Sequence, residues 1–248
     1  MNLRVTAATH RGLVRSENQD AVVVDGWVAQ VSGTLATRDL TVDAGPAVVA
    51  VLDGMGGHAG GALAAVVGAH ALVSACSSLP VPPSEADVAA LLGRANESVC
   101  AAAQGELADL GATVAAVVLT PESIDVVNAG DCRVYRLDPP YLGQLTVDDR
   151  VPSPQDPSRS LVSQSLGRHG RGSVTPHVVR LDPRVPQVLL LCSDGLHDVV
   201  DHAVVADQFA VDGVDARAVV QVLLRAALTA GAPDNVSVVI VEIGPDPR

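Results

Sequence analysis

The apolar positions of this chain fall into short valine-rich runs and longer stretches with helical spacing. Residues 47–52, AVVAVL, form a continuous apolar run of the kind that makes a buried strand. The alanine-rich stretch 62–76 and the apolar spacing over 85–107 predict two successive helices. The prolines within 79–84 separate these helices, because proline cannot continue a helix, and Ser84 suits the start of the second one.

The other apolar runs predict strands and one further helix. We expect strands at 3–10, 21–25, 112–119, 123–128, 132–137, 143–147, 175–181, 187–193 and 236–243, and an amphipathic helix at 215–230. Because the turns that join the four strands of 112–147 are short, those strands should be antiparallel neighbours. Residues 3–10 and 21–25 could pair as a hairpin, whereas 30–45 is patterned too weakly for more than a connection or a frayed hairpin.

The order of these elements is strands, two helices, strands, a helix and a last strand. This order predicts an α+β domain with largely antiparallel sheets, without the regular alternation of a parallel α/β fold. The length suits one domain over 1–248. Residues 148–172 are polar and proline-rich with no period, and a loop of that length in a compact domain is typical of a mobile lid or a functional insertion.

Composition narrows the classes of partner. A hydrophobic content of 48% and a charged content of 18% indicate a globular chain. The net charge of −12 and the aromatic content of 2% argue against nucleic acid or an anionic membrane as a partner. The chain has no lysine, which excludes a Schiff-base lysine, and no signal core or comfortable membrane span. We therefore expect a cytoplasmic protein with reduced thiols at its four cysteines.

The candidate chemistry centres on DGMGGHAGG, residues 53–61, which links the run 47–52 to the first predicted helix. Its glycines let the backbone turn tightly and approach a ligand closely. The helix N-terminus that follows favours anions. An ordinary strand-to-helix turn with a capping aspartate is the alternative interpretation.

Five aspartates, Asp53 among them, share one setting: a β-rich run with Gly or Asn beside the carboxylate. They are Asp20 in NQD, Asp53 after VVAVL, Asp131 in NAGD, Asp194 after VLLLCS and Asp234 in GAPDN. Carboxylates at strand ends can converge on one edge of a sheet, where their mutual repulsion raises their pKa values and a divalent cation relieves it. Oxygen ligands without His or Cys favour Mg²⁺ or Mn²⁺. Taken singly, each aspartate could also be a turn or cap residue.

Six segments carry a resemblance to a known family. They are GLVRSENQD, VLDGMGGHAGG, LGATVAAVVL, NAGDCRVYRL, LLLCSDGLHDVV and GAPDNVSVVIV. With these segments in this order, the chain resembles the PPM/PP2C metal-dependent protein serine/threonine phosphatases in their compact bacterial form. The resemblance implies a four-layer α-β-β-α sandwich with two largely antiparallel central sheets and a metal centre at one end.

The resemblance also implies a set of metal ligands. Asp53 would bridge two ions, Mn²⁺ or Mg²⁺, and the backbone carbonyl of Gly54 would bind the second. Asp194 and Asp234 would bind the first ion, and Asp20 would serve the second directly or through water. A water that bridges the two ions would attack phosphorus, so no protein nucleophile is required.

Three further positions take their roles from the same resemblance. Asp131 matches the aspartate that, with Asp194, holds a loosely bound third ion. Arg15 matches the phosphate-binding arginine. Met55 stands where mammalian members have a histidine proposed as general acid, so His58 becomes the candidate for that role, with a structural role beside the glycine turn as the alternative.

The chain also departs from the family pattern near the second ion and in the flap, the segment 148–172 that would cover the site. Gln19 and Ala62 stand where many members have Glu, and Asp149 stands where a His is common. The flap at 148–172 is shortened and proline-rich, so substrate choice does not carry over.

The resemblance, together with the aspartate pattern, implies metal-dependent hydrolysis of phosphoserine and phosphothreonine in proteins, opposing a bacterial Ser/Thr kinase. The expected form is a monomer that binds phosphorylated proteins. Two alternatives stay open. One is a non-catalytic phosphoprotein-binding regulatory module on the same fold, and the other is a metal phosphoesterase that acts on small molecules.

Overall fold

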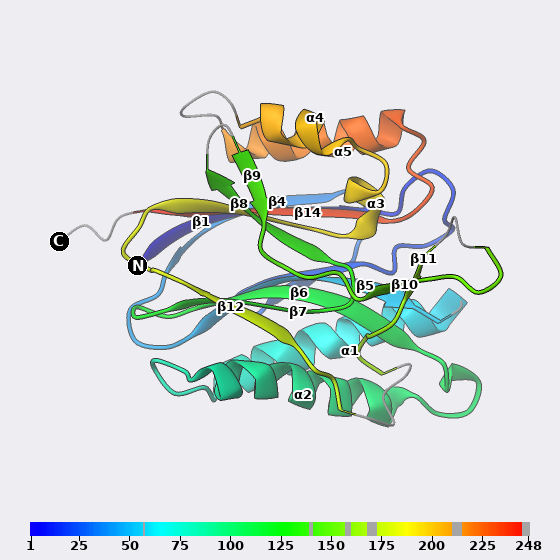
Figure 1. Cartoon of the computed structure of the whole chain (residues 1–248), viewed down its shortest axis with the longest axis horizontal. Coiled ribbons are helices and arrows are strands. Elements are labelled where there is room, and N and C mark those ends of the chain that lie inside the picture. The colour runs from blue at the N-terminus through cyan, green and yellow to red at the C-terminus, as the bar shows by residue number, and fades with distance from the viewer. Residues whose placement is uncertain (57, 139–140, 157–159, 168–172, 210–214, 245–248) are drawn as a thin grey trace.

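The computed structural model describes residues 1–56, 58–138, 141–156, 160–167, 173–209 and 215–244. Two antiparallel six-stranded sheets lie face to face, and helices cover the outer face of each sheet (Figure 1). This arrangement confirms the predicted α+β class and the α-β-β-α sandwich. No helix within the described residues is both long and apolar enough to cross a bilayer.

Each sheet draws its strands from distant parts of the chain. The first has the order β4 (Thr34–Thr41), β1 (Asn2–His10), β14 (Val236–Ile243), β13 (Gln187–Cys192), β8 (Arg133–Asp138) and β9 (Tyr141–Gln144). The second has the order β12 (His177–Leu181), β7 (Ile124–Ala129), β6 (Gly111–Leu119), β5 (Ala47–Met55), β2 (Ala21–Val24) and β3 (Trp27–Ala29).

The helices lie on two sides of this pair of sheets. Helices α1 (His58–Cys76) and α2 (Glu85–Ala102) cover the second sheet, followed by the short 3₁₀ helix η1 (Gly105–Leu107). Helices α3 (Asp194–His197), α4 (His202–Asp207) and α5 (Ala216–Thr229) lie on the side of the first sheet. A small separate hairpin consists of β10 (Arg150–Pro152) and β11 (Ser160–Val162).

The continuous apolar runs follow from burial on both faces of a strand. In β5, Ala50 and Leu52 pack in the cluster beneath α1 and α2, whereas Val49 and Val51 pack between the two sheets. All nine residues of β6 are buried in the same way. Burying each such Val or Leu side chain contributes about 1.5–3 kcal/mol, so the strands at the centre of the sandwich hold its sheets together.

Two predicted strand pairings are wrong, and both errors come from chain that crosses between the sheets. Strands β1 and β2 do not form a hairpin, because β1 pairs with β14 and β4, and β2 pairs with β3 and β5. The expected four-stranded meander also splits: β6 pairs with β7, but β8 pairs with β13 in the other sheet. The loop 11–20 and the turn 130–132 therefore each connect one sheet to the other.

Several elements differ in extent from the prediction. The weakly patterned segment 30–45 contains β4, which pairs with β1 over eight positions and is largely exposed, as suits the edge of a sheet. Helix α1 begins at His58, ahead of the predicted residue 62. Within 148–172, β10 and β11 form a hairpin and Leu166 bridges to Ala112, while 157–159 and 168–172 lie outside the described residues.

Candidate active site

All five predicted aspartates lie at the ends of strands or just beyond them. Asp53 is near the end of β5, and Asp194 opens α3 directly after β13. Asp20 and Asp234 precede β2 and β14, and Asp131 lies in the turn between β7 and β8. The carboxylates converge on the end of the sandwich that carries α3, β10 and β11, where burial and then the other four carboxylates raise the pKa of Asp53.

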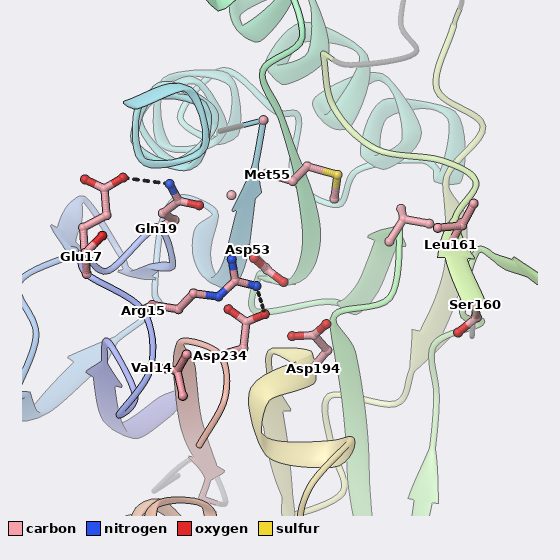
Figure 2. A pocket seen from close by; sticks show the side chains of 14 residues that line it. Val14, Arg15, Glu17, Gln19, Asp53, Met55, Ser160, Leu161, Asp194 and Asp234 are labelled. Atoms are coloured by element: carbon pink, nitrogen blue, oxygen red, sulfur yellow. Dashed lines mark hydrogen bonds and ion pairs between the residues drawn. The ribbon is translucent and has the colours of Figure 1, made fainter. Parts of the chain in front are cut away.

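A cavity of about 700 Å³ opens at this end of the molecule. Arg15, Asp53, Asp194 and Asp234 point into it, and Leu161 of β11 forms the opposite wall (Figure 2). The floor of the cavity is therefore acidic, and Arg15 is the one arginine among the side chains labelled in Figure 2.

Burial disfavours the charged form of three of these carboxylates and raises their pKa values. Burial raises the pKa of Asp20 to about 7, against hydrogen bonds from serine hydroxyls that lower it. Burial, and then Asp131 and Asp234, raise the pKa of Asp194 to about 7. The pKa of Asp53 is raised well above its ordinary value by burial and by the carboxylate of Asp194. A bound cation would relieve this repulsion.

Asp20 precedes β2 of the second sheet, and its side chain is held by residues of the first sheet. Its side chain is fully buried, and its Oδ2 accepts a hydrogen bond of 2.7 Å from the Ser193 hydroxyl. That hydroxyl in turn accepts the backbone N–H of Ser237 at 3.0 Å. Ser193 therefore fixes Asp20 and, as the residue before Asp194, places both carboxylates on one edge.

Gly54 lies where three segments meet. A Cβ on this residue would collide with the backbone carbonyl of Gly61 and approach the carbonyl of Gln19 to 2.7 Å. Only glycine fits between the start of α1 and the loop 11–20 without moving backbone. The predicted need for close backbone approach at this turn is thus seen at Gly54.

Arg15 lies on a loop that hydrogen bonds hold in place, but its side chain is half exposed. Its Nη2 donates to Asp234 Oδ2 at 2.5 Å, and 53% of its side chain is exposed. The buried Asn235 anchors the loop by accepting from the N–H of Gln19 and donating to the carbonyls of Arg11 and Glu17. Asn235 was not predicted, although it directly follows Asp234 in GAPDN.

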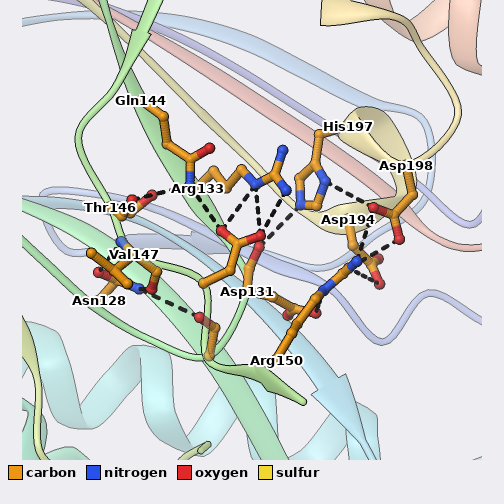
Figure 3. A network of polar contacts seen from close by, with 12 residues as sticks. Asn128, Asp131, Arg133, Gln144, Thr146, Val147, Arg150, Asp194, His197 and Asp198 are labelled. Carbon is orange, nitrogen blue, oxygen red and sulfur yellow. Dashed lines mark hydrogen bonds and ion pairs between the residues drawn. The ribbon is translucent and has the colours of Figure 1, made fainter. Parts of the chain in front are cut away.

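Arg150 is a second arginine that the sequence analysis did not single out. It lies on β10, within the segment expected to be a flap, and its Nε donates to Asp131 Oδ2 at 2.7 Å. Its Nη atoms contact both oxygens of Asp198, and its Nη2 lies 3.6 Å from Asp194 Oδ2. Figure 3 shows this guanidinium between Asp131 and Asp198.

The base of the flap is tied to the turn that carries Asp131. Asp149 accepts the N–H of Gly130 at 2.8 Å, and its own N–H donates to the carbonyl of Gly130 at 3.0 Å. Its other carboxylate oxygen lies 3.0 Å from His177 Nε2. The Oδ2 that accepts from Gly130 also accepts from Gln164 Nε2 at 2.9 Å, so the position where a histidine is common holds a carboxylate with three structural contacts.

The structure does not describe the side chain of His58, the predicted general acid. His58 is the first residue of α1, and its side chain lies outside what the structure describes. Met55, by contrast, lines the cavity (Figure 2). The role of His58 remains a prediction.

The donor set suits divalent cations. Three buried carboxylate oxygens, Oδ1 of Asp20, Asp131 and Asp194, have no hydrogen-bond partner within the described part of the chain. As the side chains stand there, no three His, Cys, Asp or Glu groups converge on one point, and Asp234 and Asp131 instead hold arginines. Mg²⁺ or Mn²⁺ would satisfy these unpartnered oxygens, and two of the three carboxyl groups, Asp20 and Asp194, also have raised pKa values.

The fold and the site together define an antiparallel α-β-β-α sandwich with an oxygen-rich acidic centre. Residues 36–215 match the family model described as Protein phosphatase 2C. The chain is 30% identical to serine/threonine protein phosphatase PstP of Mycobacterium tuberculosis over 257 residues, which cover 97% of this chain and 45% of that protein. This chain therefore belongs to the protein phosphatase 2C family.

Solved structures agree with this assignment. The crystal structure of Mycobacterium tuberculosis PstP/Ppp has a TM-score of 0.78 at 28% identity, with 98% of this chain and 99% of that one covered. The catalytic domain of PstP in complex with two manganese ions has a TM-score of 0.77 at 27% identity, with 99% and 100% covered. The chain spans 45% of the length of the curated PstP sequence that it matches, but all of this catalytic domain.

Proposed function

We propose that this chain is a protein serine/threonine phosphatase that hydrolyses phosphoserine and phosphothreonine with two Mn²⁺ or Mg²⁺ ions. The observation that carries the proposal is the set of carboxylate oxygens that have no partner within the described residues, beside a cavity that the exposed Arg15 lines. Its relatives named as serine/threonine phosphatases, and the PstP domain solved with two manganese ions, support the same activity.

The residues would divide the work as follows. Asp53 lies at the centre of the acidic group and would contact both ions, with Asp194 and Asp234 toward one and Asp20 and the carbonyl of Gly54 toward the other. When bound, the ions supply Lewis acidity and a water that loses its proton near neutral pH.

Arg15 would bind the phosphate of the substrate. Its guanidinium has one carboxylate partner, Asp234, and is half exposed at the mouth of the cavity. A phosphoryl group offers two oxygens to the guanidinium fork, and charge-assisted contacts of this kind are strong. Arg15 would therefore release its hydrogen bond to Asp234 and bind the phosphate, and the carboxylate of Asp234 would bind a metal ion instead.

The partners follow from the chemistry. Phosphoserine and phosphothreonine are made by protein kinases, so the enzyme would oppose a Ser/Thr kinase in the cytoplasm. The net charge of −12 disfavours nucleic acid as a ligand. We further propose that the chain acts as a monomer and a single domain over 1–248, with the flap at 148–172 and His58 as general acid.

Initial rates on a phosphothreonine peptide and on a small phosphate monoester, each with Mn²⁺, Mg²⁺ or EDTA, test this proposal. We expect turnover of the peptide with either cation and none with EDTA. Binding of the peptide without turnover would favour the regulatory module. Turnover of the monoester alone would favour the small-molecule phosphoesterase.

A further inference from the structure

We propose that Arg150 supplies the positive charge between Asp131 and Asp194, and that this chain therefore binds two divalent cations and excludes a third. The inference rests on the proposed two-cation centre. It assigns a positioning role to an arginine of the flap, which links the flap hairpin to the acidic centre.

The geometry places one guanidinium against three carboxylates. Its Nε lies 2.7 Å from Asp131 Oδ2, and its Nη2 lies 3.6 Å from Asp194 Oδ2. Nη1 and Nη2 donate to the two oxygens of Asp198 at 3.1 and 2.9 Å. A cation bound jointly by Asp131 and Asp194 would have to occupy the place where this guanidinium lies (Figure 3).

Burial fixes the guanidinium in that place. Only 21% of the Arg150 side chain and 3% of the Asp131 side chain are exposed. Asp198, at 45% exposed, holds the outer side of the fork with two hydrogen bonds. The planar fork can serve Asp131 and Asp198 together, which a single point charge cannot do.

The surroundings of Asp131 reinforce this arrangement. His197 Nε2 donates to the backbone carbonyl of Asp131 at 3.0 Å, so that oxygen is already in use. Asp149, next to Arg150, is hydrogen-bonded to Gly130 on the other side of Asp131. Displacing Arg150 would therefore pull on the flap as well as break its own contacts.

The same contacts position the wall of the cavity. Arg150 pairs with Val162 across the β10–β11 hairpin, and Ser160, Leu161 and Val162 line the cavity from that hairpin. Through Arg150, the wall that faces the substrate is attached to the acidic centre by an ion pair rather than by a shared metal ion.

Counting bound ions tests the proposal directly. Mn²⁺ bound per chain would be measured by equilibrium dialysis, up to concentrations well above the dissociation constant of the tight sites. We expect two ions for the wild type and three for Arg150→Gln. The double variant Arg150→Gln/Asp131→Asn should return to two, because it removes a ligand of the site that the single variant opens.

Arg133→Gln is the matched control. Its side chain is 22% exposed, close to the 21% of Arg150, and its three hydrogen bonds to a carboxylate go to Asp148. Loss of this guanidinium should leave the count at two. Three ions in the wild type, or two in Arg150→Gln, would overturn the proposal, as would three in Arg133→Gln.

A measurement on the wild type alone covers the case in which the variants do not fold. Anomalous diffraction from crystals soaked in Mn²⁺ should show two peaks, with Arg150 still on Asp131. A third peak between Asp131 and Asp194 with Arg150 displaced would refute the inference. Activity is a separate outcome: a count of two without phosphopeptide turnover would reject the proposed function only, and a count of three with turnover would reject the role of Arg150 only.

Discussion

Of the residues that the structure describes, Arg15 and Arg150 approach the same acidic centre, and their settings are opposite. Arg15 forms an ion pair with one described carboxylate, Asp234, and 53% of its side chain is exposed. Arg150 contacts three carboxylates, and 21% of its side chain is exposed. An exposed pair contributes about 0.2–1 kcal/mol and is easily exchanged. A buried one is costly to break, because it leaves a charge without compensation.

The difference indicates how one type of side chain serves two purposes. Arg15 stands on a loop pinned by Asn235, so its backbone is fixed while its guanidinium is available to a ligand. Arg150 is fixed at the guanidinium itself, on the flap. The first setting suits recognition of a phosphate, and the second suits the shaping of the site.

The largest expected effect removes the centre that both arginines serve. Asp53→Ala should reduce phosphopeptide turnover to the detection limit, because this carboxylate lies among all the others. The metal-free variant should be no less stable than the wild type, since it loses mutual repulsion among carboxylates. Initial rates with Mn²⁺ and thermal unfolding in EDTA check the two halves. The control is Asp39→Ala, at an exposed ion pair on β4. Turnover retained in Asp53→Ala would contradict the proposed mechanism.

Removing the buried arginine, Arg150, should destabilise the protein. Arg150→Gln should lower the free energy of unfolding of the metal-free protein by about 3 kcal/mol, because Asp131 stays buried without its partner. Urea unfolding in EDTA measures this loss. The exposed pair of Arg4 with Asp39 gives the control, and Arg4→Gln should leave the free energy of unfolding nearly unchanged. Equal losses in the two variants would show that burial of Arg150 has no energetic consequence.

Removing the exposed arginine, Arg15, should instead weaken the binding of substrate. Arg15→Gln should raise KM for a phosphopeptide about tenfold or more, since a charge-assisted hydrogen bond contributes about 1.5–3 kcal/mol. Its free energy of unfolding should change by less than about 1 kcal/mol, as for other exposed pairs. Steady-state kinetics on one peptide provide the measurement. An unchanged KM would leave Arg15 as a solvated loop residue.

A further expected effect is a dependence of stability on pH in the absence of metal. The pKa values of Asp20 and Asp194 are raised from 3.8 to about 7, so the folded state binds more protons than the unfolded state between these values. The free energy of unfolding should therefore fall as pH rises from about 4 to about 7 and level off above that window. Urea unfolding in EDTA at pH 5 and at pH 8 tests the sign. Greater stability at pH 8 in EDTA would be the opposite of what the burial of these carboxylates requires.

The sequence predicted the elements of the fold better than their pairing. Apolar runs identified most strands, since both faces of β5 and β6 are buried. The hairpin of β1 with β2 was wrong, because a change of sheet leaves no local signal in the loop 11–20. The polar edge strand β4 was missed as a strand because none of its residues is buried.

In the candidate site, too, local patterns were predicted from the sequence, whereas contacts between distant segments were not. The five aspartates share a strand-end pattern, and the structure brings them together. Arg150 has no such pattern, because it lies in an aperiodic segment and its partner Asp198 is 48 residues away. Asp198 does lie within LLLCSDGLHDVV, so its segment was singled out although its contact was not.

One set of experiments tests the contrast between the two arginines most directly: KM for a phosphopeptide and the number of bound Mn²⁺ ions, measured on the wild type, Arg15→Gln and Arg150→Gln. We predict that Arg15→Gln raises KM and keeps two ions, whereas Arg150→Gln binds three. If both variants raised KM alike and left the ion count at two, the two arginines would not have the separate roles inferred from their burial and contacts.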